Sequence, residues 1–173
     1  MRSDPHGALR GALCGVGALL YDDPVRPDIR SARPDDVAGV LAFWEDATTA
    51  TSTDTAASLL ALIEHDAGAL IVAEEAGQVV GTVIAGWDGW RGSVYRLAVA
   101  PVQRRRGLAT QLLRVAEDRL ARSGARRVHA IVVATEARAV AFWEATGWTY
   151  EREQRRYTTE VHLGDSGRGP GPP

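Results

Sequence analysis

Apolar residues along the chain follow two spacings, of which one is typical of helices and the other of strands. Apolar positions 37, 40, 41 and 44 have helical spacing and predict a helix that begins at Pro34. Further helices are predicted over residues 54–65, with Asp54 as the cap, and over residues 107–122 and 136–146. Strands are predicted over residues 29–33, 69–74, 78–87, 93–99 and 128–133, with a final strand pair within residues 148–163. The order of these elements predicts an α/β domain whose sheet is mixed, with hairpins as well as crossovers.

The two ends of the chain lack the pattern of a folded core. Residues 1–27 hold one short apolar stretch, which is Gly-rich and shorter than the roughly 18 residues that a membrane span needs. No small-residue cleavage site follows it, so we expect a partly disordered N-terminal extension rather than an export signal. Residues 164–173 are rich in Gly and Pro and predict a disordered tail. A single domain is therefore expected over residues 28–163.

Composition narrows the classes of function. The 173 residues include 20 basic residues, all of them Arg, and 22 acidic residues, for a formal net charge of −2. This balance argues against a nucleic-acid-binding protein, which typically has a strongly basic surface. A single Cys and 4 scattered His argue against a disulfide framework and a zinc site, so no metal is expected. We expect a cytoplasmic protein without a membrane partner.

The most informative segment, residues 95–110, joins a predicted strand to a predicted helix through a loop that contains Pro101, three consecutive Arg and Gly107. A helix N-terminus presents unpaired N–H groups and the positive end of the helix dipole, and both attract phosphate. Gly107 would let the backbone approach an anion closely, and Arg side chains are bidentate phosphate donors. The P-loop Lys-Ser/Thr pair and the three glycines of a dinucleotide fingerprint are missing. The segment predicts a phosphate-binding loop, with a solvated basic loop as the alternative.

Two motifs lie in the second half of the chain. The first is Arg104-x-x-Gly107-x-Ala109, and the second is AVAFWEATGW, residues 139–148. They resemble the acyl-CoA loop R/Q-x-x-G-x-G/A and the A-x-x-F/L-Y-E-x-x-G-F signature of the GCN5-related N-acetyltransferase (GNAT) superfamily. Residues 80–83 and the loop WDGWRG also resemble a bacterial subfamily of small, poorly characterised members. The resemblance covers residues 28–163 and implies the GNAT fold, a mixed sheet of about 6–7 strands flanked by about 4 helices.

The resemblance implies how acetyl-CoA would bind. In that family the pantetheine arm pairs with the backbone of the strand that here carries Leu97, Ala98 and Val99. The backbone N–H of Val99 would then point at the thioester oxygen and stabilise the oxyanion. Main-chain donors of Arg105, Arg106, Gly107, Leu108, Ala109 and Thr110 would wrap the pyrophosphate, and Arg104 of the same loop is also expected to bind the cofactor.

Two positions on the cofactor side depart from the family pattern. Trp143 stands where the second motif often has a tyrosine that protonates the leaving thiolate. An indole N–H donates hydrogen bonds but is no acid near neutral pH, so Trp143 would pack beside the sulfur while water delivers the proton. Glu136 stands where the family frequently has Asn. For Glu136, capping of the following helix is favoured over a place beside the CoA phosphates.

No general base is evident, so residues on the acceptor side are predicted from position alone. Ser93 and Tyr95 share one face of their strand and could form a water relay for the proton of an amine. Asp88 and Arg91 lie in a loop near the expected acceptor entrance, where a turn-forming Asp and a solvent-facing Arg are an equal alternative. Trp44 could line the acceptor pocket or belong to the core.

The resemblance implies an acyl-CoA-dependent N-acyltransferase, with acetyl-CoA as donor and an amine as acceptor, on a small molecule or on a protein N-terminus or lysine. The amine would attack the thioester directly in a ternary complex, without a metal or a covalent enzyme intermediate. A longer acyl donor remains open. The missing tyrosine and base favour an alternative, a non-catalytic acyl-CoA-binding or regulatory module. The chain would be a monomer, or a homodimer formed through residues 151–163.

Overall fold

The computed structural model describes residues 26–47 and 54–158. The elements in chain order are β1 (Asp28–Ser31), a short 3-10 helix (Pro34–Asp36), α1 (Val37–Ala47), α2 (Ala56–His65), β2 (Leu70–Glu75), β3 (Gln78–Trp87), β4 (Gly92–Val99), a second 3-10 helix (Pro101–Gln103), α3 (Leu108–Arg122), β5 (Val128–Ala130) and α4 (Ala137–Ala145). The predicted tail and residues 1–25 of the predicted extension lie outside the described residues.

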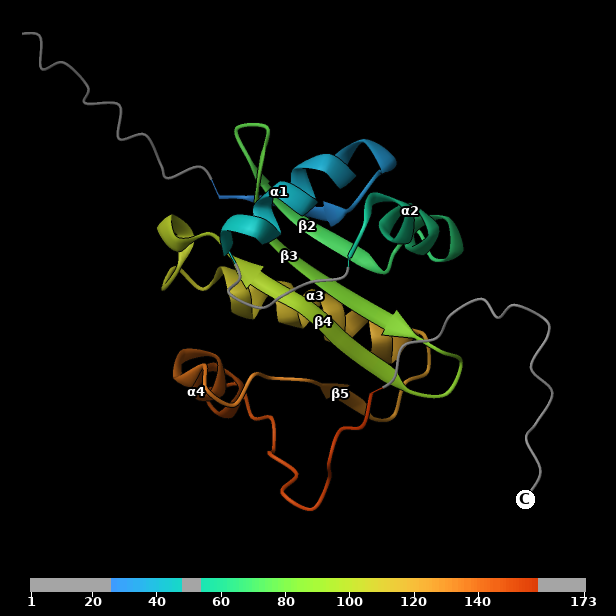
Figure 1. Ribbon diagram of the computed structural model, residues 1–173, viewed down its shortest axis with the longest axis vertical. Helices are drawn as coiled ribbons and strands as arrows, with labels where there is room; N and C mark the ends of the chain where they lie inside the picture. Colours follow the sequence, from blue (N-terminus) through green and yellow to red (C-terminus); the bar gives the residue numbers. More distant parts are fainter. Residues whose placement is uncertain (1–25, 48–53, 159–173) are drawn as a thin grey trace, which may run out of the picture. The chain divides into compact units, whose positions relative to one another are not determined.

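The centre of the fold is a five-stranded sheet in the order β1-β2-β3-β4-β5 (Figure 1). The pairs β1–β2, β2–β3 and β3–β4 are antiparallel. Ala76 and Gly77 connect β2 to β3 with φ of 51° and 76°, the positive values that a type I′ hairpin turn requires. The α+β fold and the hairpin are therefore confirmed, whereas the described part of the sheet has fewer strands than the predicted 6–7.

The missing strands are those predicted within residues 148–163. Residues 148–158 contain no strand, and residues 159–163 lie outside the described part. The stretch EREQRR, residues 151–156, has only polar side chains and is exposed, so it offers no apolar face to a sheet. β5 is likewise shorter than predicted, since it ends at Ala130.

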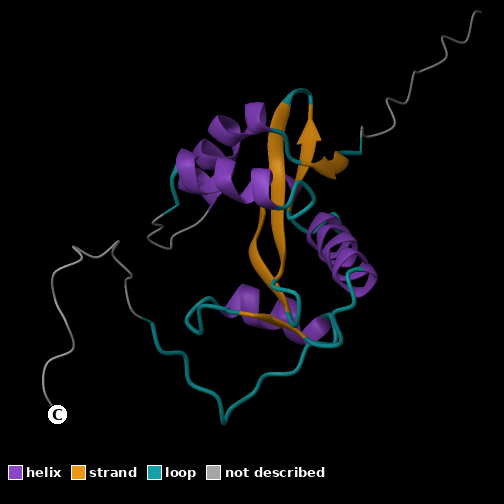
Figure 2. Cartoon of the chain, turned by 90° about the vertical axis from the view of Figure 1, so that its right-hand side faces the viewer, coloured by secondary structure: helices purple, strands orange, loops and turns teal. Residues whose placement is uncertain are grey.

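Helices cover both faces of the sheet in the first part of the chain. Figure 2 shows α1 and α2 on one side of the strands and α3 on the other. Consecutive residues of β3 face these two sides: Thr82 contacts Trp44 of α1, whereas Gly81 lies against Leu112 of α3. The buried cluster under α1 and α2 consists of Ala32, Val37, Val40, Trp44, Leu59, Ile63, Leu70 and Val72. A sheet covered on both faces explains the continuous apolar run in β2.

The start of α2 differs from the prediction. Its N-cap is Thr55, not Asp54, because the Thr55 hydroxyl accepts a hydrogen bond from the Ser58 N–H at 3.1 Å. The Ser58 hydroxyl in turn accepts one from the Thr55 N–H at 2.9 Å, which completes a reciprocal capping box. The carboxylate of Asp54 therefore serves another partner, as described below.

The chain divides into two compact units, one ending at Val128 and the other beginning at His129. The first unit carries α1–α3 and β1–β4, and the second carries α4, after which Gly147 has φ of 85°. Among the described residues, no helix is long and apolar enough to cross a membrane.

Candidate functional site

A bulge interrupts β4 midway along its length. Arg96 and Leu97 together oppose the single residue Val83 of β3, so β4 contains one extra residue at this point. Arg96 has φ of 51°, a left-handed conformation that residues with side chains rarely adopt. Bulges bend a strand and redirect its side chains, and they are frequent beside functional sites. Here the bulge includes Leu97, the first of the three strand residues predicted to bind pantetheine.

A buried threonine of β3 stabilises the bulge. The hydroxyl of Thr82 donates to the carbonyl oxygen of Arg96 at 2.8 Å and accepts from the indole N–H of Trp44 at 2.9 Å. Thr82 is fully buried, so both bonds form away from water, where an unpaired polar group is costly. The backbone of β4 is therefore tied through Thr82 to a side chain of α1.

The side chain of Arg96 makes a second connection to the helices. Its guanidinium lies 4.9 Å from the centroid of the Trp44 ring, and its Nη2 lies 2.6 Å from Oδ2 of Asp54. Stacking and ion pairing together fix the orientation of a long side chain that is otherwise flexible. Four segments thus meet beside the bulge: α1, the segment before α2, β3 and β4.

Beyond the bulge, the backbone of β4 presents polar groups to the edge opposite β3. The N–H of Ala100 donates to the carbonyl oxygen of Val80 at 2.9 Å, which places Ala100 in register with β3. Hydrogen-bonding direction alternates along an antiparallel strand, so the N–H and C=O of Val99 point away from β3. The Val99 carbonyl accepts from Nε of Arg104 at 3.1 Å, as this direction requires. The Val99 N–H therefore has the orientation that the predicted oxyanion donor needs.

The loop between β4 and α3 has the backbone of an anion-binding site. Arg105 and Gly107 have positive φ, 65° and 82°, and Gly107 is the N-cap of α3. Left-handed residues beside turn residues direct successive N–H groups into one concave surface. No side chain caps α3, so its first N–H groups are left for an external acceptor. The loop from Arg104 to Gly107 is exposed, whereas Leu108 is buried and holds the helix start on the core.

The side chain of a buried glutamine attaches this loop to the end of β2. Gln103 is only 4% exposed, and its side-chain amide N–H donates to the carboxylate of Glu75 at the end of β2. Its carbonyl oxygen accepts from Arg106 at 3.4 Å. The loop is therefore attached both to β4, through Arg104, and to β2, through Gln103.

Known proteins that resemble this chain identify its family. The model of the acetyltransferase (GNAT) family matches residues 36–148, well over half of the chain. This chain belongs to the GNAT family. The resemblance seen in the two motifs is thereby confirmed, and acetyl-CoA is the donor that acetyltransferases of this family use.

Individual GNAT relatives agree in sequence and in fold. The acetyltransferase ECA0875 of Pectobacterium atrosepticum is 36% identical over 106 residues, which cover 61% of this chain and 75% of that protein. Ard1 from Thermoplasma volcanium superposes with a TM-score of 0.63 at 23% identity, over 71% of this chain and 82% of that chain. AAC(6')-Iy, in complex with the bisubstrate analogue CoA-S-monomethyl-acetylneamine, gives a TM-score of 0.62 at 16% identity, over 78% of this chain and 98% of that chain. The two structures show that the fold is shared.

Within this GNAT fold, Ser93 and Tyr95 lie on the face of β4 that carries α1 and α2. Ser93 is 9% exposed, whereas Tyr95 is 43% exposed. The Tyr95 ring lies over Gly86 of β3, where an added Cβ would be 3.5 Å from Cε2. The two residues share a face, as predicted, and of the two Tyr95 is the more accessible to a substrate or to water.

The three predicted acceptor residues do not form one group. Trp44 is 3% exposed and belongs to the core cluster, which favours the core alternative. Asp88 and Arg91 lie in the loop before β4, where Oδ1 of Asp88 accepts from the backbone N–H groups of Trp90 and Arg91 at 2.8 and 2.6 Å. Asp88 is therefore turn-forming. Arg91 stacks on Trp90, with 4.2 Å from its guanidinium carbon to the ring centroid.

The second unit carries the remaining two predicted residues. Glu136 is the N-cap of α4 by position, but its side chain makes no capping hydrogen bond, so the predicted side-chain cap is wrong. Trp143 is half-buried and meets Trp148 edge-on, with 4.5 Å between ring centroids, and Phe142 at 5.8 Å. The indole is thus held in an aromatic cluster of its own unit.

Several site residues carry no signal that sequence alone reveals. Thr82 and Arg96 come together through pairing of β3 with β4, whereas Asp54 reaches Arg96 from the segment before α2. The bulge also breaks the alternation by which strand faces are predicted. Gln103 has the composition of an ordinary loop residue, although it is buried. Within the part of the chain that the structure describes, no three His, Cys, Asp or Glu side chains gather closely enough to hold a metal ion.

Proposed function

We propose that this GNAT protein transfers an acetyl group from acetyl-CoA to an amine by direct attack in a ternary complex. The observation that carries the proposal is the outward N–H of Val99, between a bulge on one side and an uncapped helix N-terminus on the other. Acetyl-CoA has a thioester at one end and a pyrophosphate farther along. These two groups match, in the same order, the Val99 N–H and the N-terminus of α3, which follow one another along the chain.

The donor would be held mostly by main-chain atoms. The outward backbone groups of Leu97 and Val99 would pair with the amides of the pantetheine arm, as an added strand would, whereas those of Ala98 between them point toward Thr82 of β3. The N–H groups of Leu108, Ala109 and Thr110, at the start of α3, would bind the pyrophosphate. Arg104, held on the Val99 carbonyl, would keep the loop against the strand, while the exposed side chains of Arg105 and Arg106 add positive charge.

The transfer step would need a hydrogen-bond donor for the thioester oxygen and a route by which the amine loses its proton. The N–H of Val99 would donate to the thioester oxygen and stabilise the negative charge that develops there when the amine attacks. Tyr95, with Ser93 behind it on the same face, would hold a water that takes the proton from the attacking amine. Trp143 would pack beside the leaving sulfur and Glu136 would lie on the cofactor side, as the family resemblance implies, and water would supply the proton to the thiolate.

The experiment that tests donor binding is calorimetry with acetyl-CoA, free CoA and longer acyl-CoAs on the wild type and on Gly107→Glu. A carboxylate at the start of α3 would repel the pyrophosphate, so we expect affinity to fall at least about tenfold, or 1.4 kcal/mol. Gly77→Glu is the matched control. Gly77 has a similar φ, 76° against 82°, and lies in the β2–β3 turn with nothing within 4 Å of an added Cβ.

Equal affinities of Gly107→Glu and Gly77→Glu for acetyl-CoA would show that the loop before α3 does not bind the pyrophosphate. Absence of binding of any CoA species would refute the proposed function. Preference for a longer acyl-CoA would change the donor but not the site. With binding established, release of the CoA thiol in the presence of primary amines tests transfer itself.

A non-catalytic acyl-CoA-binding module is the second candidate, because Trp143 stands where a tyrosine acid is frequent. Trp143→Tyr separates the two. If protonation of the thiolate limits turnover, the variant gains rate with each amine that the wild type accepts. A binding module binds acetyl-CoA and releases no thiol, in the variant as in the wild type.

A further inference from the structure

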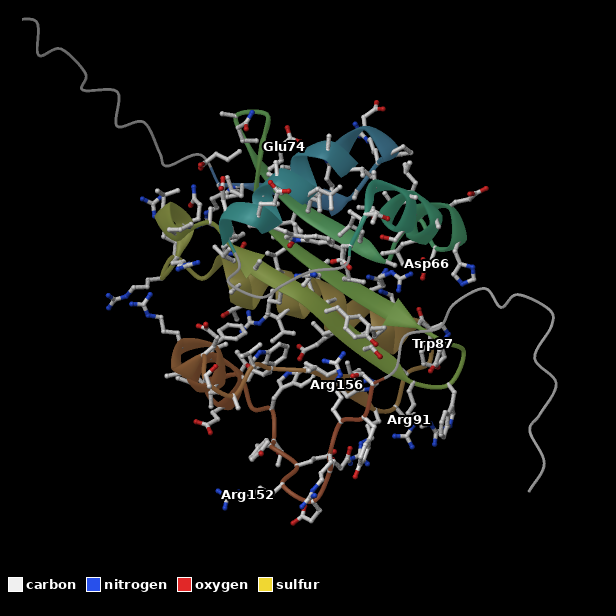
Figure 3. The ribbon with its side chains drawn as sticks, in the orientation of Figure 1. Asp66, Glu74, Trp87, Arg91, Arg152 and Arg156 are labelled. Carbon is white, nitrogen blue, oxygen red and sulfur yellow. The ribbon has the colours of Figure 1, made fainter. Side chains whose placement is uncertain are left out.

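A hollow lies at the end of the sheet where β3 turns into β4, at the opposite end of β4 from the acetyl-CoA loop. Its volume is about 340 Å³, and two glycines line it together with Trp87, Trp90, Arg91, Arg126 and Arg127. Figure 3 shows Trp87 and Arg91 at this end of the two strands. Small-molecule sites typically measure about 300–1,000 Å³, so the hollow has room for a small ligand.

The lining combines positive charge with aromatic rings. Three of its residues are Arg and none is acidic, in a chain whose formal net charge is −2. Trp90 is 72% exposed, which is unusual for the largest apolar side chain. The guanidinium of Arg91 already stacks on that ring, 4.2 Å from its centroid. Arg side chains recognise carboxylate and phosphate through paired N–H donors, and an exposed indole binds flat rings.

One wall of the hollow is built to keep its shape. The carboxylate of Asp88 accepts from the N–H groups of Trp90 and Arg91, and Gly89 between them has φ of 88°. An Asx turn of this kind restrains a loop that would otherwise sample many conformations. The side chains of Trp90 and Arg91 therefore project from a restrained backbone, which lowers the entropy cost of binding.

The opposite wall follows the end of α3. Gly124 has φ of 97°, and the N–H of Ala125 turns back to the carbonyl oxygen of Leu120 at 3.0 Å, so the chain leaves the helix in a fixed direction. Arg126 and Arg127 come next, and the carbonyl oxygen of Arg127 accepts from the N–H of Gly92 at 3.1 Å. This bond joins the two walls at the base of the hollow.

The hollow is too far from the Val99 N–H to hold the amine that attacks the thioester. Gly92 and Val99 are the first and last residues of β4, and a strand rises about 3.3 Å per residue, so they lie about 20 Å apart. A group bound between Trp90 and Arg126 therefore does not react at Val99. The hollow is a site of its own.

We propose that this hollow binds a small organic anion in which a flat ring carries a carboxylate or a phosphate group. The ring lies against Trp90 and the anionic group faces Arg91 and Arg126. The proposal goes beyond the acetyl transfer proposed above and does not depend on it, because binding here needs neither acetyl-CoA nor the acceptor.

The test is calorimetric binding of phenyl phosphate and benzoate to the full chain, with inorganic phosphate and benzyl alcohol as probes that carry only the anion or only the ring. We expect at least one of the two ring-bearing anions to bind with one-to-one stoichiometry, at least about tenfold more tightly than either partial probe. Trp90→Leu should remove most of this advantage, and Arg126→Gln should weaken binding at least about fivefold.

Arg114→Gln is the matched control, since Arg114 is exposed on α3 and does not line the hollow. It should leave the affinity for the probe within about twofold of the wild type, and Gly107→Glu, in the donor loop, should do the same. Equal loss in Arg114→Gln and Arg126→Gln would show a general charge effect and overturn the proposal. Loss of probe binding in Gly107→Glu, with probe binding intact in Arg126→Gln, would place the probe in the donor loop and overturn the proposal as well, as would absence of binding by both ring-bearing anions. Folding of each variant is checked by its acetyl-CoA affinity or by its thermal unfolding.

Discussion

Thr82→Val tests whether one buried hydroxyl maintains the bulge of β4. Valine has nearly the same shape but can neither accept from the Trp44 indole nor donate to the Arg96 carbonyl. Each buried group left without a partner costs about 1–3 kcal/mol, and burial of the new methyl group returns about 1 kcal/mol. We therefore expect the free energy of unfolding to fall by about 3 kcal/mol, a large share of the 5–15 kcal/mol typical of a domain.

The assay is urea unfolding followed by circular dichroism, with acetyl-CoA affinity as the second measurement. Thr82→Ser is the control, because it keeps the hydroxyl and loses only a methyl group, at a cost of about 1 kcal/mol. The bulge sets the direction in which β4 continues to Val99. Acetyl-CoA affinity should accordingly fall several-fold in Thr82→Val and little in Thr82→Ser.

Trp44→Phe completes a double-mutant cycle with Thr82→Val. Because the indole N–H of Trp44 donates to Thr82, the two single changes overlap, and the double variant should lose less stability than the sum of the two, by about 1 kcal/mol. Strict additivity, or equal unfolding free energies for the valine and serine variants, would refute the reasoning.

Three further predictions concern other parts of the first unit. The hydrogen bond and charge of Arg30 lower the pKa of Asp36 from 3.8 to about 2, so the stabilisation is complete above pH 4 and disappears as pH falls toward 2. Asp36→Asn should lack this acid-dependent part, about 1 kcal/mol for a pair near solvent, in unfolding curves measured between pH 2 and 6. Gly92→Ala should lower the thermal midpoint, since the new Cβ would lie 3.0 Å from the Val128 side chain, and overpacking of this kind costs about 1–3 kcal/mol. Gln103→Ala should weaken acetyl-CoA binding about fivefold by calorimetry, or about 1 kcal/mol, because the donor loop loses its attachment to β2.

Elements whose signals are local could be predicted from the sequence. The β2–β3 hairpin was predictable because Gly77 tolerates the positive φ that its turn requires. The conformation of the proposed donor loop was predictable for a similar reason, since Gly107 at φ of 82° and the start of the helix that follows determine it locally. In both cases a few neighbouring residues determine the conformation.

The bulge could not be predicted, because its causes lie far apart in the sequence. Ser93 to Val99 has the alternation of a regular strand, and an Arg at φ of 51° contradicts local preference. Thr82 and Asp54, on other elements, supply the partners that hold Arg96 there. Asp54 was predicted as a helix cap for the same reason, since its sequence context suits a cap while its actual partner is 42 positions away.

The loop after β4 and the bulge in the middle of β4 are held by different kinds of interaction. Family membership therefore says less about the acceptor than about the donor. The proposed donor loop would bind through its backbone groups, so donor binding is expected to depend little on which side chains the loop carries. The middle of β4 is held by side chains from other segments that meet at Arg96, and a change in any of them is expected to alter the surface around the bulge. Under the proposed function, the loop motif accounts for the donor, whereas the acceptor would depend on residues that the motif does not contain. Under the proposed function, the choice of amine is expected to depend on the surroundings of Arg96 and Tyr95 rather than on the loop of Asp88, whose carboxylate accepts hydrogen bonds within a turn.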